Sequence, residues 1–225
     1  ITIGILTFYK NPQPHYTLEK IKTFHEKNVS FSCPIFSPSS QRLAYLCDRS
    51  GWRSLWVYDL EKKQETHINM GETEVGNPDW VCGFTGFQWQ DDNKITAIRK
   101  KKGQSQLVEI QYPSQKVSEI PLPYSHIDEF RMLNNDLIIL ASSSDKPTEI
   151  VCFNKKTKKN RALNTILKNQ IKNFPSITPR IIEIPVETDH SSCWGAYYPA
   201  FSENKTGATI IHIHGGPTAS IDLGW

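Results

Sequence analysis

The chain has 225 residues, of which 38% are hydrophobic and 22% charged, a composition that is ordinary for a folded protein and argues against disorder. With 26 basic and 23 acidic residues its net charge is only +3, which is too weak to argue for nucleic acid or an anionic membrane as the main partner. The longest apolar runs, 137–141 and 208–213, have the length of single strands, so the sequence predicts no membrane-spanning segment.

The first residues and the cysteines bear on the compartment. The chain starts at Ile1 without the basic flank or cleavage site of a signal peptide, so we expect the sequence to begin inside a longer one. The five cysteines are odd in number and form no C-x-x-C pair, which favours buried free thiols in a reducing, cytoplasmic setting over a zinc site or a disulfide framework. The Asn-x-Ser/Thr triplets at Asn28 and Asn204 leave a secreted protein open as the alternative.

An internal repeat occupies the first three quarters of the chain. Residues 36–45, 89–98 and 130–139 each read as an aromatic strand end, a polar turn and a second strand. Asn, Asp and Ser are frequent at these turns because their side chains bond the nearby backbone. The order of features is therefore the same three times.

Each repeat continues with a further strand and a polar tip. The strands 54–60, 106–110 and 149–153 are followed by turn residues, and the basic runs 99–102 and 155–159 fall at such tips, where we expect solvated side chains. A period of about 40 to 50 residues is typical of a four-stranded β-propeller blade.

The repeats predict the number of blades. Three blades fit within residues 31–165, and residues 16–24 resemble the outer hairpin of a preceding blade. Three or four blades cannot close a ring and would leave an exposed sheet edge, so we expect more blades upstream.

The blade pattern stops at a polar stretch, 164–174, which is followed by Pro175 and resembles a linker. We therefore divide the chain into residues 1–173, the C-terminal blades of a propeller, and residues 174–225, the start of a second domain. In the second part 180–186 and 193–199 read as two strands, and 208–214 is apolar enough to be a central strand.

The last predicted strand leads into His214-Gly215-Gly216-Pro217, a turn that contains the candidate catalytic residues. Glycines without a Cβ allow a sharp turn and let backbone N–H groups approach a ligand oxygen. Donors fixed at such a turn can stabilise the oxyanion of an acyl-transfer reaction. The simpler alternative is a Gly-Gly turn with no catalytic task.

A metal site at the same turn is the other alternative. His212 and His214 are two residues apart on a predicted strand and would project to one face, as zinc ligands can. No further ligand follows at short spacing and His190 is isolated. A hydrogen-bonded histidine pair accounts for them better, and we predict neither a metal nor a cofactor.

With the repeat, the linker and the HGGP turn in place, the chain resembles the prolyl oligopeptidase family of serine peptidases, in particular its acylaminoacyl-peptidase and dipeptidyl-peptidase-like branch. The resemblance implies a partial β-propeller followed by the first strands of an α/β-hydrolase domain. It also implies that Gly216 supplies a backbone N–H to the oxyanion hole, while Gly215 and His214 shape the loop.

In that family a Ser, Asp, His triad follows this loop, and no G-x-S-x-G sequence occurs in the 225 residues. Ser105 lies in a predicted blade hairpin and Ser220 in the loop, so neither is expected to be a nucleophile. We therefore expect the chain to be a fragment of a peptidase that cleaves short peptides or acyl-peptides through an acyl-enzyme. The fragment alone should be inactive. The intact protein could form a homo-oligomer. The alternative is a non-catalytic propeller that binds a protein or peptide.

Overall fold

The structure is a computed structural model that describes residues 3–10, 16–78, 83–84, 86–165, 177–186, 192–200, 207–213, 215, 221 and 223–224. Within these residues every regular element is a β-strand, and there is no helix. The prediction of a mainly β chain is confirmed. No helix in the described part of the chain is suited to crossing a membrane.

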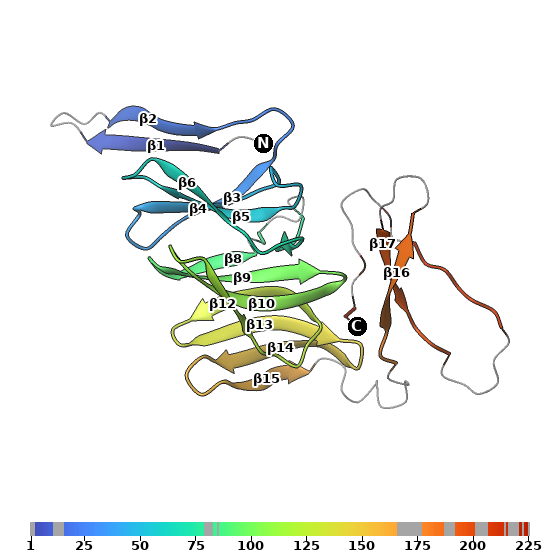
Figure 1. Ribbon diagram of the computed structural model, residues 1–225. Coiled ribbons are helices and arrows are strands. Elements are labelled where there is room, and N and C mark those ends of the chain that lie inside the picture. The colour runs from blue at the N-terminus through green and yellow to red at the C-terminus, as the bar shows by residue number, and fades with distance from the viewer. Residues whose placement is uncertain are drawn as a thin grey trace. The chain divides into compact units, whose positions relative to one another are not determined.

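The first four-stranded sheet coincides with the first predicted blade. Its antiparallel strands follow one another in chain order (Figure 1), and they are β3 (Phe31–Phe36), β4 (Arg42–Cys47), β5 (Ser54–Asp59) and β6 (Gln64–Ile68). Every residue of β4 after Arg42 is buried, so this strand is covered on both faces.

Two further sheets follow along the chain (Figure 1). The second contains β7 (Glu74–Val75), β8 (Phe87–Asp91), β9 (Lys94–Lys101), β10 (Gln104–Gln111) and β11 (Lys116–Ile120), with β7 and β8 both paired to β9. The third has the order β12 (His126–Leu133), β13 (Asp136–Ser143), β14 (Lys146–Asn154) and β15 (Lys159–Thr165). The three predicted blades are therefore confirmed as sheets.

The hairpin tips repeat the same backbone feature. A non-glycine residue with positive φ, between 52° and 59°, lies at six of them, at Ser40, Lys63, Lys102, Gln115, Asn134 and Lys158. Polar residues are favoured at such tips because they tolerate the left-handed conformation better than β-branched ones. This recurrence explains why the turns could be found from the sequence.

The chain divides into two compact units, and the second sheet contributes residues to both. The first unit is Ile1–Val75 with Trp89–Ile95 and Ile110–Val117, and the second is Gly76–Gln88 with Thr96–Glu109 and Ser118–Trp225. The predicted boundary at 173/174 falls in residues 166–176, outside the described part, and stays a prediction.

The core of the first unit joins an N-terminal hairpin to the first sheet. The hairpin, β1 (Ile3–Lys10) paired with β2 (Tyr16–Phe24), is the one predicted from residues 16–24. Phe24 is buried with its ring centroid 4.9 Å from that of Tyr45 on β4. Tilted aromatic packing of this kind helps to hold the hairpin against the sheet.

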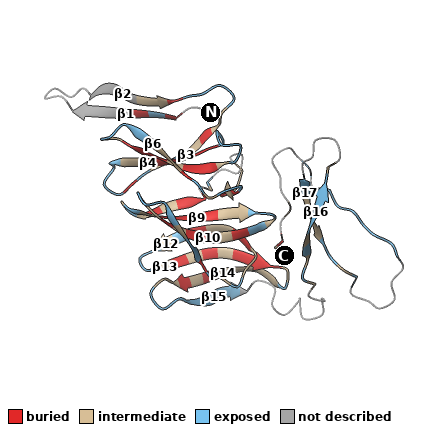
Figure 2. Cartoon of the chain, viewed as in Figure 1, coloured by how far each residue is buried: buried red, intermediate tan, exposed pale blue. Residues whose placement is uncertain are grey.

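The core of the second unit consists of alternating residues from β9 to β14. Its fully or nearly fully buried members are Ile98, Leu107, Ile120, Ile127, Phe130, Leu137, Ile139, Ala141, Val151 and Phe153. Period-two burial places one face of each strand in the core. Figure 2 shows these buried stretches in the central strands of the sheets, with exposed residues toward the hairpin tips.

The C-terminal region differs in part from its prediction. Strands β16 (Arg180–Pro185) and β17 (Ser192–Tyr197) form the predicted hairpin, and much of it is exposed (Figure 2). The central strand expected at 208–214 is wrong for its described part: residues 207–213 form no strand, and Ile210 is 95% exposed. A central strand needs hydrogen-bonded neighbours on both sides, and no described strand pairs with this segment. Accordingly, no α/β-hydrolase part is seen among the residues that the structure describes.

The cysteine prediction is also corrected. The four cysteines in the described residues are free thiols, but only Cys47 is buried, and Cys193 is exposed. Cys193 lies on the exposed hairpin β16–β17, which explains its accessibility.

Candidate functional site

The predicted catalytic turn is described at one residue. His214 and Gly216 lie outside the described residues, so their predicted roles stay predictions. Gly215 is exposed, and a Cβ built on it would meet no heavy atom within 4 Å. Gly215 is therefore a solvent-accessible position with room for a side chain in the described structure.

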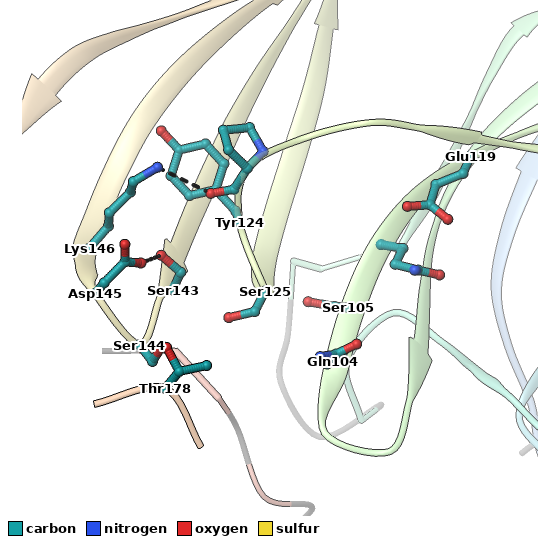
Figure 3. Close-up of a pocket in the computed structure, with 12 residues that line it drawn as sticks. Gln104, Ser105, Glu119, Tyr124, Ser125, Ser143, Ser144, Asp145, Lys146 and Thr178 are labelled. Carbon is teal, nitrogen blue, oxygen red and sulfur yellow. Dashed lines mark hydrogen bonds between the residues drawn. The ribbon is translucent and has the colours of Figure 1, made fainter. Parts of the chain in front are cut away.

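A polar pocket of about 470 Å³ lies in the second unit, where several strands begin and end. It is lined by Gln104–Gln106 at the start of β10, by the loop Pro123–Ser125 before β12, by the turn Ser143–Lys146 between β13 and β14, and by Glu119 and Thr178. Figure 3 shows these side chains around the opening. The sequence analysis missed this pocket, although the polar run 142–145 at a hairpin tip was a visible signal.

One wall of the pocket is fixed by Tyr124. Its hydroxyl donates a hydrogen bond to Glu149 Oε2 at 2.8 Å, and Lys146 Nζ lies 5.2 Å from the centre of its ring. Lys146 also donates to the carbonyl oxygen of Pro123 at 3.4 Å (Figure 3). Burial, together with the hydrogen bond to Glu149, raises the pKa of Tyr124, so its phenol stays protonated at neutral pH and is a donor.

Hydroxyl and carboxylate groups also line the pocket. Ser143 Oγ donates to Asp145 Oδ1 at 2.6 Å (Figure 3), and Glu119 adds a second carboxylate to the lining. One lysine and two carboxylates give the pocket both charges, which suits a polar ligand. The described lining residues include no histidine, so the pocket shows no serine–histidine pair of the kind that activates a hydrolase nucleophile.

Ser105 is a structural residue. Its side chain is 2% exposed, and its Oγ both accepts from the N–H of Ile127 at 2.5 Å and donates to the Ile127 carbonyl at 3.3 Å. These two bonds join β10 to β12. The geometry agrees with the exclusion of Ser105 as a nucleophile.

A histidine–aspartate pair lies beside the pocket. His126 Nε2 is 2.8 Å from Asp128 Oδ1, and the cross-strand partner of His126 is Ser142. This set has the residue types of a catalytic triad, yet Ser142 is 1% exposed. Because a substrate cannot reach that hydroxyl, the three residues do not form a hydrolase site.

The described residues contain no group of three side chains able to hold a metal ion. His212 is described and exposed, while its predicted companion His214 is not described. The histidine pair expected there stays a prediction.

Comparison with known proteins shows which folds this chain resembles. No family model matches the sequence. A TolB homolog from Protochlamydia amoebophila is 32% identical over 68 residues, which are 29% of this chain and 14% of that protein.

Three solved peptidase structures are similar to the chain. Puromycin hydrolase is 16% identical with a TM-score of 0.72, over 90% of this chain and 30% of its own. A Mycobacterium tuberculosis puromycin-hydrolyzing peptidase is 16% identical with a TM-score of 0.64, and the match covers 76% of this chain and 26% of the peptidase. Dipeptidyl peptidase 4 from Porphyromonas gingivalis is 15% identical with a TM-score of 0.62, and the match covers 86% of this chain and 27% of that protein.

At these identities the similarity concerns the fold alone. The chain is a β-propeller portion that resembles the propeller domains of prolyl oligopeptidase-family peptidases. It spans less than a third of the length of each of these structures.

Proposed function

We propose that the chain is part of a serine-type peptidase of the prolyl oligopeptidase family, in which a propeller is followed by an α/β-hydrolase domain. One observation supports this most strongly. The blades end at Thr165, which leaves about a quarter of the sequence, yet the similarity to puromycin hydrolase covers 90% of the chain. The shared fold therefore extends beyond the blades, into the region that holds β16 and β17.

The proposed reaction is hydrolysis of short peptides or acyl-peptides through an acyl-enzyme, in the cytoplasm. Gly216 would donate its backbone N–H to the oxyanion, with His214 and Gly215 shaping the turn. One such donor lowers a barrier by about 3 kcal/mol. The nucleophile, acid and base are proposed to lie outside these 225 residues, since the sequence has no G-x-S-x-G and the described lining of the pocket has no histidine.

The test is hydrolysis by the full-length protein that contains this chain. Aminoacyl, N-acetylaminoacyl and dipeptidyl p-nitroanilides should be cleaved, and replacing the serine of its G-x-S-x-G motif by alanine should abolish cleavage. The 225-residue chain serves as the matched control and should release no nitroaniline. A full-length protein that cleaves none of the three substrate classes would contradict the proposal.

A second candidate is a non-catalytic propeller that binds a protein or peptide. The 32% identity to a TolB homolog over 68 residues favours it, because that match lies outside the peptidases. This candidate gains if the full-length protein has no nucleophile motif. A motif combined with peptide cleavage would eliminate it.

A further inference from the structure

The end of the chain contacts the blades, in contrast to the segment before it. Leu223 is 2% exposed, whereas Ile210 is 95% and Ile213 82% exposed. All belong to the second unit. A specific surface therefore receives Leu223, since the isoleucines nearby in sequence are left in solvent.

The surface begins at the tip of the β9–β10 hairpin. Gly103 has a φ of +76°, and a Cβ there would lie 3.3 Å from Ile221 Cγ1 and 3.4 Å from Leu223 Cγ. Glycine thus lets both side chains approach the backbone. Next to it, Lys102 Nζ lies 3.4 Å from the centre of the Trp194 ring, so the same tip also holds β17.

A hydrogen bond fixes the direction of the segment. Ser125 Oγ donates to the carbonyl oxygen of Leu223 at 3.2 Å. The backbone of Ser125 makes two hydrogen bonds of its own. Its carbonyl accepts from the Ser105 N–H at 2.9 Å, and its N–H donates to the Ser142 carbonyl at 3.2 Å. The donor is therefore held in place before the segment binds.

The next position disfavours any side chain. A Cβ on Gly224 would overlap Ser142 Oγ and lie 3.0 Å from His126 Cβ. Both residues are nearly fully buried, and Asp128 holds the His126 ring at 2.8 Å. A side chain at position 224 would require the Ser142 hydroxyl to rotate away and would still lie close to the held His126, so the surface favours glycine there.

We propose that Gly103, Ser125, His126 and Ser142 form a latch for Ile221, Leu223 and Gly224 that requires a buried aliphatic residue at 223 and glycine at 224. One part of this inference rests on the proposed function. In the proposed peptidase the latch anchors the chain that follows the Gly215 turn, which makes His126 and Ser142 positioning residues for the candidate oxyanion turn.

The latch can be tested on the 225-residue chain without any activity. In a methyl-labelled sample, nuclear Overhauser effects should connect the methyl groups of Ile221 and Leu223 with the Hα protons of Gly103. Gly224→Ala should reduce the docked population at least about tenfold and remove these signals. Gly215→Ala is the matched control, because its Cβ meets no atom within 4 Å, and it should keep them.

A second substitution guards against a variant that simply misfolds. Ser142→Ala removes the atom that a Cβ at 224 would overlap, so the double variant Ser142→Ala/Gly224→Ala should regain part of the signals. Absence of the signals in the unmodified chain, their persistence in Gly224→Ala, or their loss in Gly215→Ala would each overturn the latch.

Kinetics of the full-length protein separate the latch from the proposed function. Gly224→Ala should lower kcat about tenfold with KM changed less than about twofold, because positioning of a transition-state donor is lost while substrate binding is kept. Gly4→Ala, an exposed site with open space, should change neither. An inactive parent refutes the proposed function and leaves the latch standing, whereas an active parent with unchanged kcat in Gly224→Ala refutes the positioning role.

Discussion

Two leucines at one hairpin provide a direct test of how the third sheet faces its core. Leu137 on β13 is fully buried, while Leu133 at the end of β12 is 59% exposed. Both lie at the β12–β13 turn, where Leu133 pairs with Asp136 and Met132 with Leu137. The same change, Leu→Ala, can therefore be made on either side of the boundary between core and solvent.

The two substitutions should lower the free energy of unfolding by amounts that differ several-fold. Burying a leucine side chain contributes about 1.5–3 kcal/mol, and a cavity left behind adds to the loss, so Leu137→Ala should cost about 3 kcal/mol. Leu133→Ala should cost about 0.5 kcal/mol or less because its side chain stays largely hydrated. In a chain of this size the first value corresponds to a fall in Tm of about 6–12 °C.

Urea and thermal unfolding followed by circular dichroism measure both variants under the same conditions. Equal losses at the two positions, or a loss below about 1 kcal/mol at Leu137, would refute the assignment of the inner face.

Three further outcomes test individual contacts. Ser105→Ala should lower the free energy of unfolding by about 1–3 kcal/mol in urea titrations, since the buried N–H of Ile127 loses its acceptor, and an unchanged midpoint would contradict this. Tyr124→Phe should cost about 1 kcal/mol by removing the bond to Glu149, and no cost would show that the wall of the pocket does not depend on it. Burial lowers the pKa of His67 below 6.5, so the unfolded chain binds this proton more readily and stability should fall as pH drops through about 6.5; NMR titration of His67 above 6.5 would contradict the shift.

The blades could be predicted because their information is local. Turn chemistry marks each hairpin, as at Asn154, whose side-chain oxygen accepts from the backbone N–H groups of Lys156 and Thr157 at 3.1 and 2.9 Å. Alternation of apolar residues then sets which face is buried. Both signals lie within a few residues of the positions they determine.

The remainder depends on partners far away in the sequence. Residues 208–213 are apolar, but a strand forms only where a neighbouring strand accepts its hydrogen bonds, and apolarity does not supply one. The pocket is assembled from segments as distant as Gln104 and Thr178, which share no motif. The contact of Leu223 with Gly103 likewise joins residues that no spacing rule connects.

The central claim, that this propeller portion belongs to a serine peptidase, is tested most directly by a fluorophosphonate probe. We predict that the full-length protein forms a covalent adduct at a serine of a G-x-S-x-G motif, and that the 225-residue chain, which has no such motif, forms none. Absence of an adduct on the full-length protein, or an adduct on any serine of this chain, would contradict the account.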